Sequence, residues 1–364
     1  RPPSYIVDDS PLSIPQADGS TWSPQNYDGK FEGQMVLRRA LYQSRNLATI
    51  RLGMELGEQS VIDMARRFGI STPIPPYPSI HIGSADVYPI EMIAAYTAFA
   101  NLGVRSTPYA IVRVENARGD VLWEPTPVRV QVMSPEESWL MVDIMKDVIQ
   151  RGTAAGSVGS VFRIPAGGKT GTTNDGADVW YIGYTSDLVA GVWMGLDKPK
   201  KIKNNAQGGI LAAPAWTAFM REVYRRKPAS PDWPQPDGIV ERQIDLASGQ
   251  LWAPGCGEAI SDYFLAGTDP IATCIPAGSP TPGAPGEPGA SPVDTSFGFP
   301  APTTPAPRPD TSTLTHRSSG GTVFSPSAPA PRAPRPRPSR DSTAGTATPR
   351  DTSNPFNLPP TQRR

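Results

Sequence analysis

Two short motifs in this 364-residue chain combine residue types that can catalyse acyl transfer. The first motif consists of Ser44, Arg45 and Asn46. The second consists of Lys169, Thr170, Gly171, Thr172 and Thr173. A lysine can serve as the base in serine-dependent acyl transfer, while a hydroxyl relays the proton and an amide holds the substrate. The two motifs therefore predict the walls of an active site that acts through a serine nucleophile.

The nucleophile itself is missing from the chain. Active sites with these two motifs normally also contain a Ser-x-x-Lys tetrad, whose serine attacks the substrate. No lysine here has a serine three positions earlier, and Lys169, for example, has Ala166 there. Because the chain also begins at Arg1 rather than at a methionine, we expect it to be the C-terminal part of a longer protein with its first catalytic residues upstream.

Each motif also has a purely structural interpretation. Lys169 and the threonines beside it could form a solvated surface strand, since threonine favours strands. Ser44 and Asn46 could cap a helix, because both residue types favour that position. The functional interpretation of the second motif is preferred because Gly171 would let a peptide approach the strand edge closely. The lysine would attract the anionic end of that peptide, and the hydroxyls on either side of the glycine could bind its carboxylate.

Composition separates a folded part from a tail. The chain contains 44 prolines, about half of which follow Cys274. Residues 275–364 contain few large apolar side chains, so burial cannot offset their chain entropy. We predict that they form a disordered tail rich in Pro, Ala, Ser and Thr. Its Arg-Pro alternation at residues 331–338 is expected to be an extended spacer rather than a ligand for an anionic polymer. The formal net charge is +0, so no nucleic-acid partner is expected.

The elements that must position the two motifs are helices and a small antiparallel sheet, which together indicate an α+β domain. Hydrophobic periodicity predicts helices at residues 36–43, 47–56, 61–68, 90–100, 135–150 and 214–226. The first motif lies on the turn between the first two helices. Strands are expected at 168–172, 179–184 and 188–194, so the second motif begins a meander. Residues 110–123 predict a separate hairpin, and residues 1–31 an irregular segment.

Cys256 and Cys274 are the only cysteines. In an exported protein we expect them to close a small disulfide loop, the alternative being two unrelated buried thiols. Neither a signal peptide nor a run of about 18 apolar residues is present. The chain itself is therefore expected to span no membrane, while an anchor upstream of Arg1 stays open.

Four other residues that can do chemistry are expected to be structural. His81 lies in a proline-rich stretch and His316 in the tail, so both are expected to be solvated rather than catalytic. Trp180 and Tyr181 could line a substrate groove, but packing on a sheet face is the preferred interpretation.

Further stretches, in the same order along residues 1–274, resemble the C-terminal portion of class A penicillin-binding proteins, the bifunctional peptidoglycan glycosyltransferase/transpeptidases. The resembling stretches are residues 9–11, 22–27, 44–46, 83–87, 94–96, 99–103, 152–154, 168–173, 178–184 and 213–216. Residues 244–251 and 264–270, with the two cysteines, resemble the C-terminal extension of that class, of the 1A type. A β-lactamase ends soon after its last helix and would lack this extension.

The resemblance implies an α+β penicillin-binding transpeptidase fold like that of the serine β-lactamases, an antiparallel sheet flanked by helices, incomplete at its N-terminus. It divides the chain at residues 1–228, the C-terminal part of a transpeptidase domain, and 229–274, a small extension; residues 275–364 are the tail. Without the Ser-x-x-Lys helix, the chain alone is expected to be inactive and to lack part of its core.

The resemblance also implies the roles of the motif residues. The reaction would be D,D-transpeptidation, in which stem peptides are cross-linked by serine acyl transfer at D-Ala-D-Ala and β-lactams acylate the same serine. Ser44 would relay a proton, Asn46 would hold the substrate amide, and Lys169 would be the electrostatic partner of Ser44. Residues 170–173 would bind the substrate, with the hydroxyls of Thr170 and Thr172 on its carboxylate and the backbone N–H of Thr172 as an oxyanion donor.

The implied partners are peptidoglycan stem peptides, the lipid-linked precursor and β-lactam antibiotics. No metal or organic cofactor is implied. The parent protein would lie in the inner membrane through an upstream anchor, with its catalytic domains in the periplasm. Two alternatives stay open: a D,D-carboxypeptidase or monofunctional transpeptidase with the same site, and a non-catalytic pseudoenzyme fragment.

Overall fold

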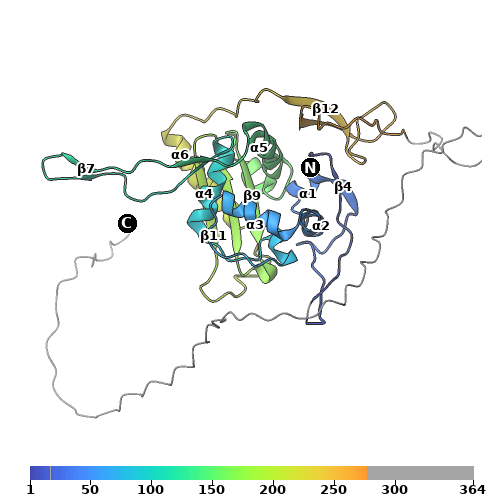
Figure 1. Ribbon diagram of the computed structural model, residues 1–364, viewed down its shortest axis with the longest axis horizontal. Coiled ribbons are helices and arrows are strands. Elements are labelled where there is room, and N and C mark those ends of the chain that lie inside the picture. The colour runs from blue at the N-terminus through green and yellow to red at the C-terminus, as the bar shows by residue number, and fades with distance from the viewer. Residues whose placement is uncertain (17, 277–364) are drawn as a thin grey trace, which may run out of the picture. The chain divides into compact units, whose positions relative to one another are not determined.

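The computed structural model describes residues 1–16 and 18–276 (Figure 1). At its centre is a three-stranded antiparallel sheet in the order β11-β10-β9. The strands are β9 (Gly167–Thr172), β10 (Val179–Tyr184) and β11 (Val189–Met194). They follow one another along the chain, which confirms the predicted meander with Lys169 on its first strand. β9 pairs with β10 alone among the described strands, so its other edge is not occupied by a strand.

Helices form where the periodicity predicted them, and the last three in chain order pack against this sheet. The helices are α1 (Leu37–Tyr42), α2 (Asn46–Leu56), α3 (Glu58–Arg67), α4 (Pro89–Ala100), α5 (Pro135–Gln150) and α6 (Ala212–Arg226), with the short turns η1 (Pro78–Ile82), η2 (Ala155–Gly159) and η3 (Asn174–Gly176). Their ends differ from the predicted ones by small shifts. The capping box that opens α5 is present, because Ser134 Oγ accepts from the Glu137 N–H and the Glu137 carboxylate accepts from the Ser134 N–H.

The core lies where α6 packs on β10 and β11. The indole of Trp216 is fully buried, and its Nε1 donates to the Gly183 and Ala190 carbonyls at 3.2 and 3.1 Å. A Cβ at Gly183 would come within 2.7 Å of that indole, so the glycine makes room for it. Tyr181 is buried edge-on against Trp216, with ring centroids 5.3 Å apart, which confirms its predicted role in the core. Trp180 is only half-buried and lies beside Trp193.

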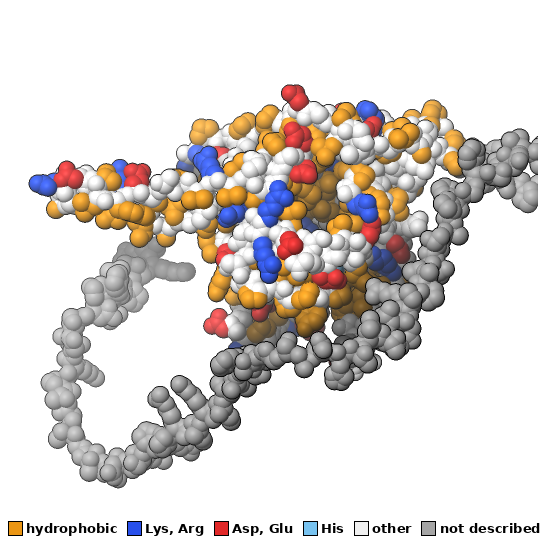
Figure 2. Space-filling view, viewed as in Figure 1, with side chains coloured by type: hydrophobic (Ala, Val, Ile, Leu, Met, Phe, Trp, Pro, Cys, Tyr) orange, Lys and Arg blue, Asp and Glu red, His pale blue; other side chains and the backbone are white. Residues whose placement is uncertain are grey.

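Short two-stranded ladders surround the centre. The pairs are β1 (Ile6–Asp8) with β4 (Gln34–Val36), β2 (Ile14–Pro15) with β3 (Thr21–Trp22), β5 (Val104–Ser106) with β8 (Arg129–Gln131), and β6 (Val114–Glu115) with β7 (Val121–Trp123). The segment expected to be irregular thus contains three short strands. The predicted hairpin is only partly formed, because residues 110–112 are not in a strand. It extends away from the sheet, and its apolar side chains are exposed rather than buried (Figures 1 and 2).

The C-terminal extension is a hairpin with a small core of its own. Strands β12 (Ile239–Asp245) and β13 (Ala259–Leu265) bury Ile244, Ile260 and Phe264 between them. Cys256 and Cys274 are bonded, which confirms the predicted disulfide. The described residues all belong to one compact unit. Of the expected tail, only residues 275 and 276 are described by the structure. The rest of the tail, with His316, lies outside the described residues.

A buried arginine joins the extension to the helices. Arg38 of α1 donates through Nε to Asp262 of β13 at 2.9 Å and through Nη1 to Asp147 of α5 at 2.7 Å, and it also pairs with Asp143. Three carboxylates around one guanidinium compensate the desolvation of the cation. Within the described ranges, no helix has the length and apolar composition that crossing a bilayer would require.

The prediction that His81 is solvated is wrong. Its side chain is only 1 % exposed, because η1 packs the ring against α2. A Cβ at Gly53 would lie 2.2 Å from the imidazole Cγ, so this helical glycine leaves the space that the ring fills. The ring Nε2 lies 3.5 Å from the Glu58 carboxylate. Gly53 lies 28 positions before His81, so the residues around the histidine in the sequence do not indicate this contact.

Candidate active site

The turn that carries Ser44 has a strained backbone. The N–H of Ser44 donates to the Leu41 carbonyl at 3.0 Å, and the N–H of Arg45 donates to the Ala40 carbonyl at 2.9 Å. These two bonds form a Schellman motif at the end of α1, in which the residue after the C-cap adopts a left-handed conformation and is usually glycine. Ser44 has φ of +58° there. A side chain in this conformation costs about 1 kcal/mol, and such strain clusters at functional sites.

The hydroxyl of this serine meets the lysine of the second motif. Lys169 Nζ donates to Ser44 Oγ at 2.6 Å and to the Thr170 carbonyl at 2.9 Å. Burial lowers the pKa of the Lys169 ammonium to about 8, because both of these partners are uncharged. A lysine with this pKa is partly neutral near neutral pH, so it can exchange a proton with the hydroxyl that it contacts. The structure therefore brings together the two residues on which the predicted chemistry depends.

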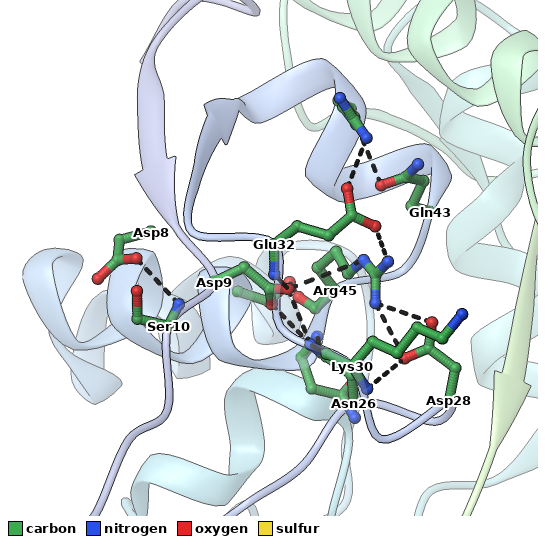
Figure 3. A network of polar contacts seen from close by, with 12 residues as sticks. Asp8, Asp9, Ser10, Asn26, Asp28, Lys30, Glu32, Gln43 and Arg45 are labelled. Atoms are coloured by element: carbon green, nitrogen blue, oxygen red, sulfur yellow. Dashed lines mark hydrogen bonds and ion pairs between the residues drawn. The ribbon is translucent and has the colours of Figure 1, made fainter. Parts of the chain in front are cut away.

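A buried charge network holds the turn from the other side (Figure 3). The guanidinium of Arg45 donates through Nη1 to both carboxylate oxygens of Asp28 at 3.0 and 3.1 Å, pairs through Nη2 with Glu32, and lies 3.8 Å from Asp9. Arg45 is 4 % exposed and Asp9 is completely buried. Burial raises the pKa of the Asp9 carboxyl, although hydrogen bonds from Asn26 oppose that effect. The middle residue of the first motif therefore anchors the turn and does not face a substrate.

Asn26 connects this network to the start of α2. Its Nδ2 donates to both oxygens of Asp9, at 2.8 and 2.9 Å, and its Oδ1 accepts from the backbone N–H of Asn46 at 2.7 Å. The N-cap of α2 is Arg45, and no side chain of the cap residue bonds the helix. The alternative that Ser44 and Asn46 are simple N-caps is therefore wrong. A residue from 20 positions earlier satisfies the helix terminus instead.

Asn46 keeps one polar group available. Its Nδ2 donates to the Gln25 carbonyl at 2.8 Å, and the side chain is half-buried. Among the residues that the structure describes, no hydrogen bond engages its Oδ1, so that oxygen can accept an amide proton. This geometry is compatible with the role predicted for Asn46, which stays a prediction.

The threonine hydroxyls of the second motif each have a partner in the protein. Thr170 Oγ1 lies 2.7 Å from Thr153 Oγ1, and Thr172 Oγ1 accepts from the Gly208 N–H at 3.0 Å. Thr173 Oγ1 accepts from the Asp178 N–H at 2.8 Å. Because Thr172 is an acceptor in its bond, its own proton is still available to a ligand. The hydroxyls of Thr170 and Thr172, which are predicted to bind the substrate carboxylate, are thus positioned by residues outside the motif.

A close backbone approach does occur at Gly171, but the approaching chain is the protein's own. A Cβ at Gly208 would lie 2.6 Å from the Gly171 carbonyl oxygen and 2.2 Å from that of Trp180. Sequence analysis missed both Gly208 and Thr153 as parts of this site. Residues 152–154 are part of the resemblance without a predicted role for Thr153, and no signal around Gly208 separates it from the chain's other glycines.

The comparisons with known proteins agree with this geometry. Residues 6–221 match the penicillin binding protein transpeptidase domain, and residues 235–275 match the penicillin-binding protein 1A C-terminal domain. The chain belongs to the penicillin-binding protein transpeptidase family. This confirms the predicted α+β transpeptidase fold and the resemblance to class A enzymes of the 1A type.

Several curated proteins that are similar to this chain are penicillin-binding proteins 1A. Penicillin-binding protein 1A of Neisseria lactamica is 35% identical over 245 residues, which are 65% of this chain and 30% of that protein. Penicillin-binding protein 1A of Pseudomonas aeruginosa is 31% identical over 333 residues, covering 77% of this chain and 40% of that protein. The chain thus spans less than half of the length of these curated relatives.

Solved structures show the same fold. Penicillin-binding protein 1A from Haemophilus influenzae has a TM-score of 0.69 at 28% identity, covering 74% of this chain and 46% of that one. The PonA1 protein of Mycobacterium tuberculosis, solved in complex with penicillin V, has a TM-score of 0.53 at 27% identity and covers 64% of this chain and 65% of that one.

Proposed function

We propose that this penicillin-binding protein is a peptidoglycan D,D-transpeptidase whose serine nucleophile lies upstream of Arg1. The observation that carries the proposal is the 2.6 Å bond between Lys169 Nζ and Ser44 Oγ, which joins residues 125 positions apart. The match to the penicillin binding protein transpeptidase domain supports the reaction, and the penicillin V complex of PonA1 supports binding of β-lactams.

The proposed reaction has two acyl-transfer steps. The upstream serine attacks the carbonyl of the D-Ala-D-Ala peptide bond and gives its proton to Ser44, and the C–N bond breaks to release the terminal D-Ala. Ser44 passes a proton to this leaving amine, while Lys169 exchanges a proton with Ser44. An amine of a second stem peptide then attacks the acyl-enzyme, which forms the cross-link and restores the serine.

The remaining motif residues hold the substrate in this proposal. The peptide pairs with the edge of β9, because a strand edge binds extended peptides through main-chain hydrogen bonds. The hydroxyls of Thr170 and Thr172 bind its terminal carboxylate. The backbone N–H of Thr172 stabilises the oxyanion, and such a donor is typically worth about 3 kcal/mol of activation barrier. Asn46 Oδ1 accepts the substrate amide proton.

The match to the 1A C-terminal domain favours a bifunctional class A parent over a carboxypeptidase or a monofunctional transpeptidase. The proposed parent contains a glycosyltransferase domain that uses lipid-linked precursor, and an anchor in the inner membrane. The Cys256–Cys274 disulfide supports a periplasmic location of this part of the chain, since disulfides persist in oxidising compartments.

Acylation by a fluorescent penicillin tests this function. We expect the protein with its native upstream sequence to be labelled, and the 364-residue chain alone to remain unlabelled. Lys169→Ala should lose most of the labelling, whereas Lys198→Ala, which removes an exposed lysine after β11, should label like the unsubstituted protein. No labelling of the native protein would contradict the proposal and favour the pseudoenzyme.

A further inference from the structure

Thr153 touches the elements that carry both motifs. It follows α5, its hydroxyl is 2.7 Å from Thr170 Oγ1 on β9, and its N–H donates at 3.3 Å to the carbonyl of Tyr42, the last residue of α1. Tyr42 lies two positions before Ser44. Thr153 thus connects the end of α1, which leads into the serine turn, with the strand that carries Lys169.

The contacts around Thr153 leave its backbone little freedom. A Cβ at the preceding Gly152 would lie 2.3 Å from the Tyr42 carbonyl oxygen. A Cβ at Gly209 would lie 2.3 Å from the Thr153 carbonyl oxygen. The neighbouring Gly208 is the residue whose N–H bonds Thr172. Gly152 and Gly209 therefore let other parts of the chain pack closely around Thr153. This close packing restricts the position of the Thr153 hydroxyl.

The two hydroxyls can share their protons in only one way when an anion is bound. When no ligand is bound, either hydroxyl of the Thr153–Thr170 pair can donate to the other. A carboxylate only accepts hydrogen bonds, so Thr170 must give its single proton to the carboxylate when it binds one. Thr153 must then donate to Thr170 Oγ1. Chains of hydrogen bonds polarise one another, which strengthens the bond from Thr170 to the anion.

The pair is also accessible to a ligand. Thr153 lines an open hollow of about 570 Å³ together with Ser157, Gln207 and Ile210. Thr170 is not among the residues that line this hollow, but both threonines are half-buried rather than enclosed. A hydroxyl pair in the core would serve packing alone. Because both threonines are half-buried, the same pair can present a donor to a carboxylate bound at the protein surface.

We propose that Thr153 is a positioning residue that orients the Thr170 hydroxyl as a donor, and so sets the preference of this site for substrates with a free carboxylate. The inference rests on the proposed function, because it needs Thr170 to bind the substrate carboxylate. Thr153 does not touch the reacting atoms, and it acts through Thr170.

The test compares two ligands that differ at one group, a penicillin and the same penicillin with its carboxylate replaced by a primary carboxamide. The protein with its native upstream sequence is used, and the second-order acylation rate constant is measured for each ligand. Thr153→Val removes the hydroxyl at nearly constant volume, and we expect the free acid to react up to about tenfold more slowly, the size of one net hydrogen bond. The carboxamide should change less than about twofold, since it can donate to Thr170 itself.

Two variants separate positioning from folding. Thr153→Ser keeps the hydroxyl and should restore the rate with the free acid. Thr97→Val is a matched control, because the Thr97 hydroxyl bonds the Ala94 carbonyl and the Ser106 N–H, away from both motifs. It should leave the ratio of the two rate constants unchanged. Thr153→Val should also have no further effect when Thr170→Val is already present.

Equal losses for the free acid and the carboxamide would overturn this inference and leave the proposed function standing. The same holds for an additive loss in the double variant, or for failure of serine to restore the rate. No acylation of the unsubstituted protein by the free acid would overturn the proposed function, and this inference with it.

Discussion

Lys169 Nζ and Ser44 Oγ are joined by a hydrogen bond of 2.6 Å, and the lysine finds only uncharged partners there. The serine sits in a strained left-handed turn and the lysine on an edge strand, so two independent elements of the fold must be in place for the bond to form. This dependence yields predictions that separate the chemistry of the site from the stability of its supports.

The rate of acylation should depend on pH through Lys169. Burial lowers the pKa of its ammonium to about 8, so the neutral form that accepts a proton becomes more populated as pH rises from about 6 to 9. The second-order rate constant for acylation, measured across this range, should therefore increase with an apparent pKa near 8. Lys169→Arg stays protonated and should be slow and independent of pH. A flat profile for the unsubstituted protein would show that Lys169 does not titrate in the reaction.

The stability of the folded protein should also rise with pH through the same lysine. Its pKa is lower in the folded state than the ordinary value of 10.5, so the unfolded chain binds more protons between these values. The penalty for burying the ammonium is present below pH 8 and is relieved as pH approaches 10.5. Thermal unfolding of Lys169→Met, which removes the charge, should lose this part of the pH dependence. The same slope in both proteins would contradict the prediction.

Replacing Ser44 by glycine and by alanine should separate strain from chemistry. Both changes remove the hydroxyl, so both should slow acylation about 100-fold or more if Ser44 relays the proton. Glycine adopts the left-handed conformation freely, whereas alanine keeps the strain of the +58° φ angle. The glycine variant should therefore unfold at a higher temperature than the alanine variant, by the equivalent of about 1 kcal/mol. Equal melting temperatures would indicate that the turn relaxes in the alanine variant.

Removal of the Arg45 guanidinium should be strongly destabilising. Arg45→Met leaves Asp9 buried without its cation, and breaking one partner of a buried ion pair costs about 3 to 5 kcal/mol. Arg118→Met is the matched control, since the Arg118 side chain is 84% exposed and its pair with Asp120 contributes at most about 1 kcal/mol. Thermal unfolding followed by circular dichroism compares the two variants. Similar small losses for both would show that the network of Figure 3 does not hold the turn.

Loss of the disulfide should destabilise the extension selectively. A cross-link that closes a loop with a sequence separation of 18 contributes about 3 kcal/mol by restricting the unfolded chain. Replacing Cys256 and Cys274 by serine should speed hydrogen exchange in β12 and β13 while β10 keeps its protection. Penicillin labelling of the full protein should remain. Faster exchange in β10 to the same degree would mean that the extension and the sheet unfold as one unit.

Helices and strands that are determined by residues close together in the sequence could be predicted from it. The capping box of Ser134 and Glu137 opens α5 as expected, and Gly57 follows α2 with a positive φ of 84°. The apolar run of β10 formed the predicted second strand of the meander. In each case the deciding contacts lie within a few positions along the chain, so the residue pattern carries the information.

Elements whose cause lies far away in the sequence were not predictable. The hairpin β6–β7 is shorter than predicted because its apolar side chains meet no partner surface among the described residues. His81 is buried because Gly53 leaves space on a helix that packs against it. Pattern analysis can say that a residue type favours burial or exposure, but the surface that covers it depends on the fold.

The sequence by itself determined the family, the α+β class, the disulfide and the residue types of the site, because motifs and periodicity are properties of short stretches. Only the tertiary structure decided that Ser44 occupies a strained turn, that Arg45 faces a buried network, and that the Thr170 hydroxyl is tied to Thr153. The last two relationships join segments that lie apart in the sequence, 17 positions for Thr153 and Thr170, and packing is settled by all the segments together.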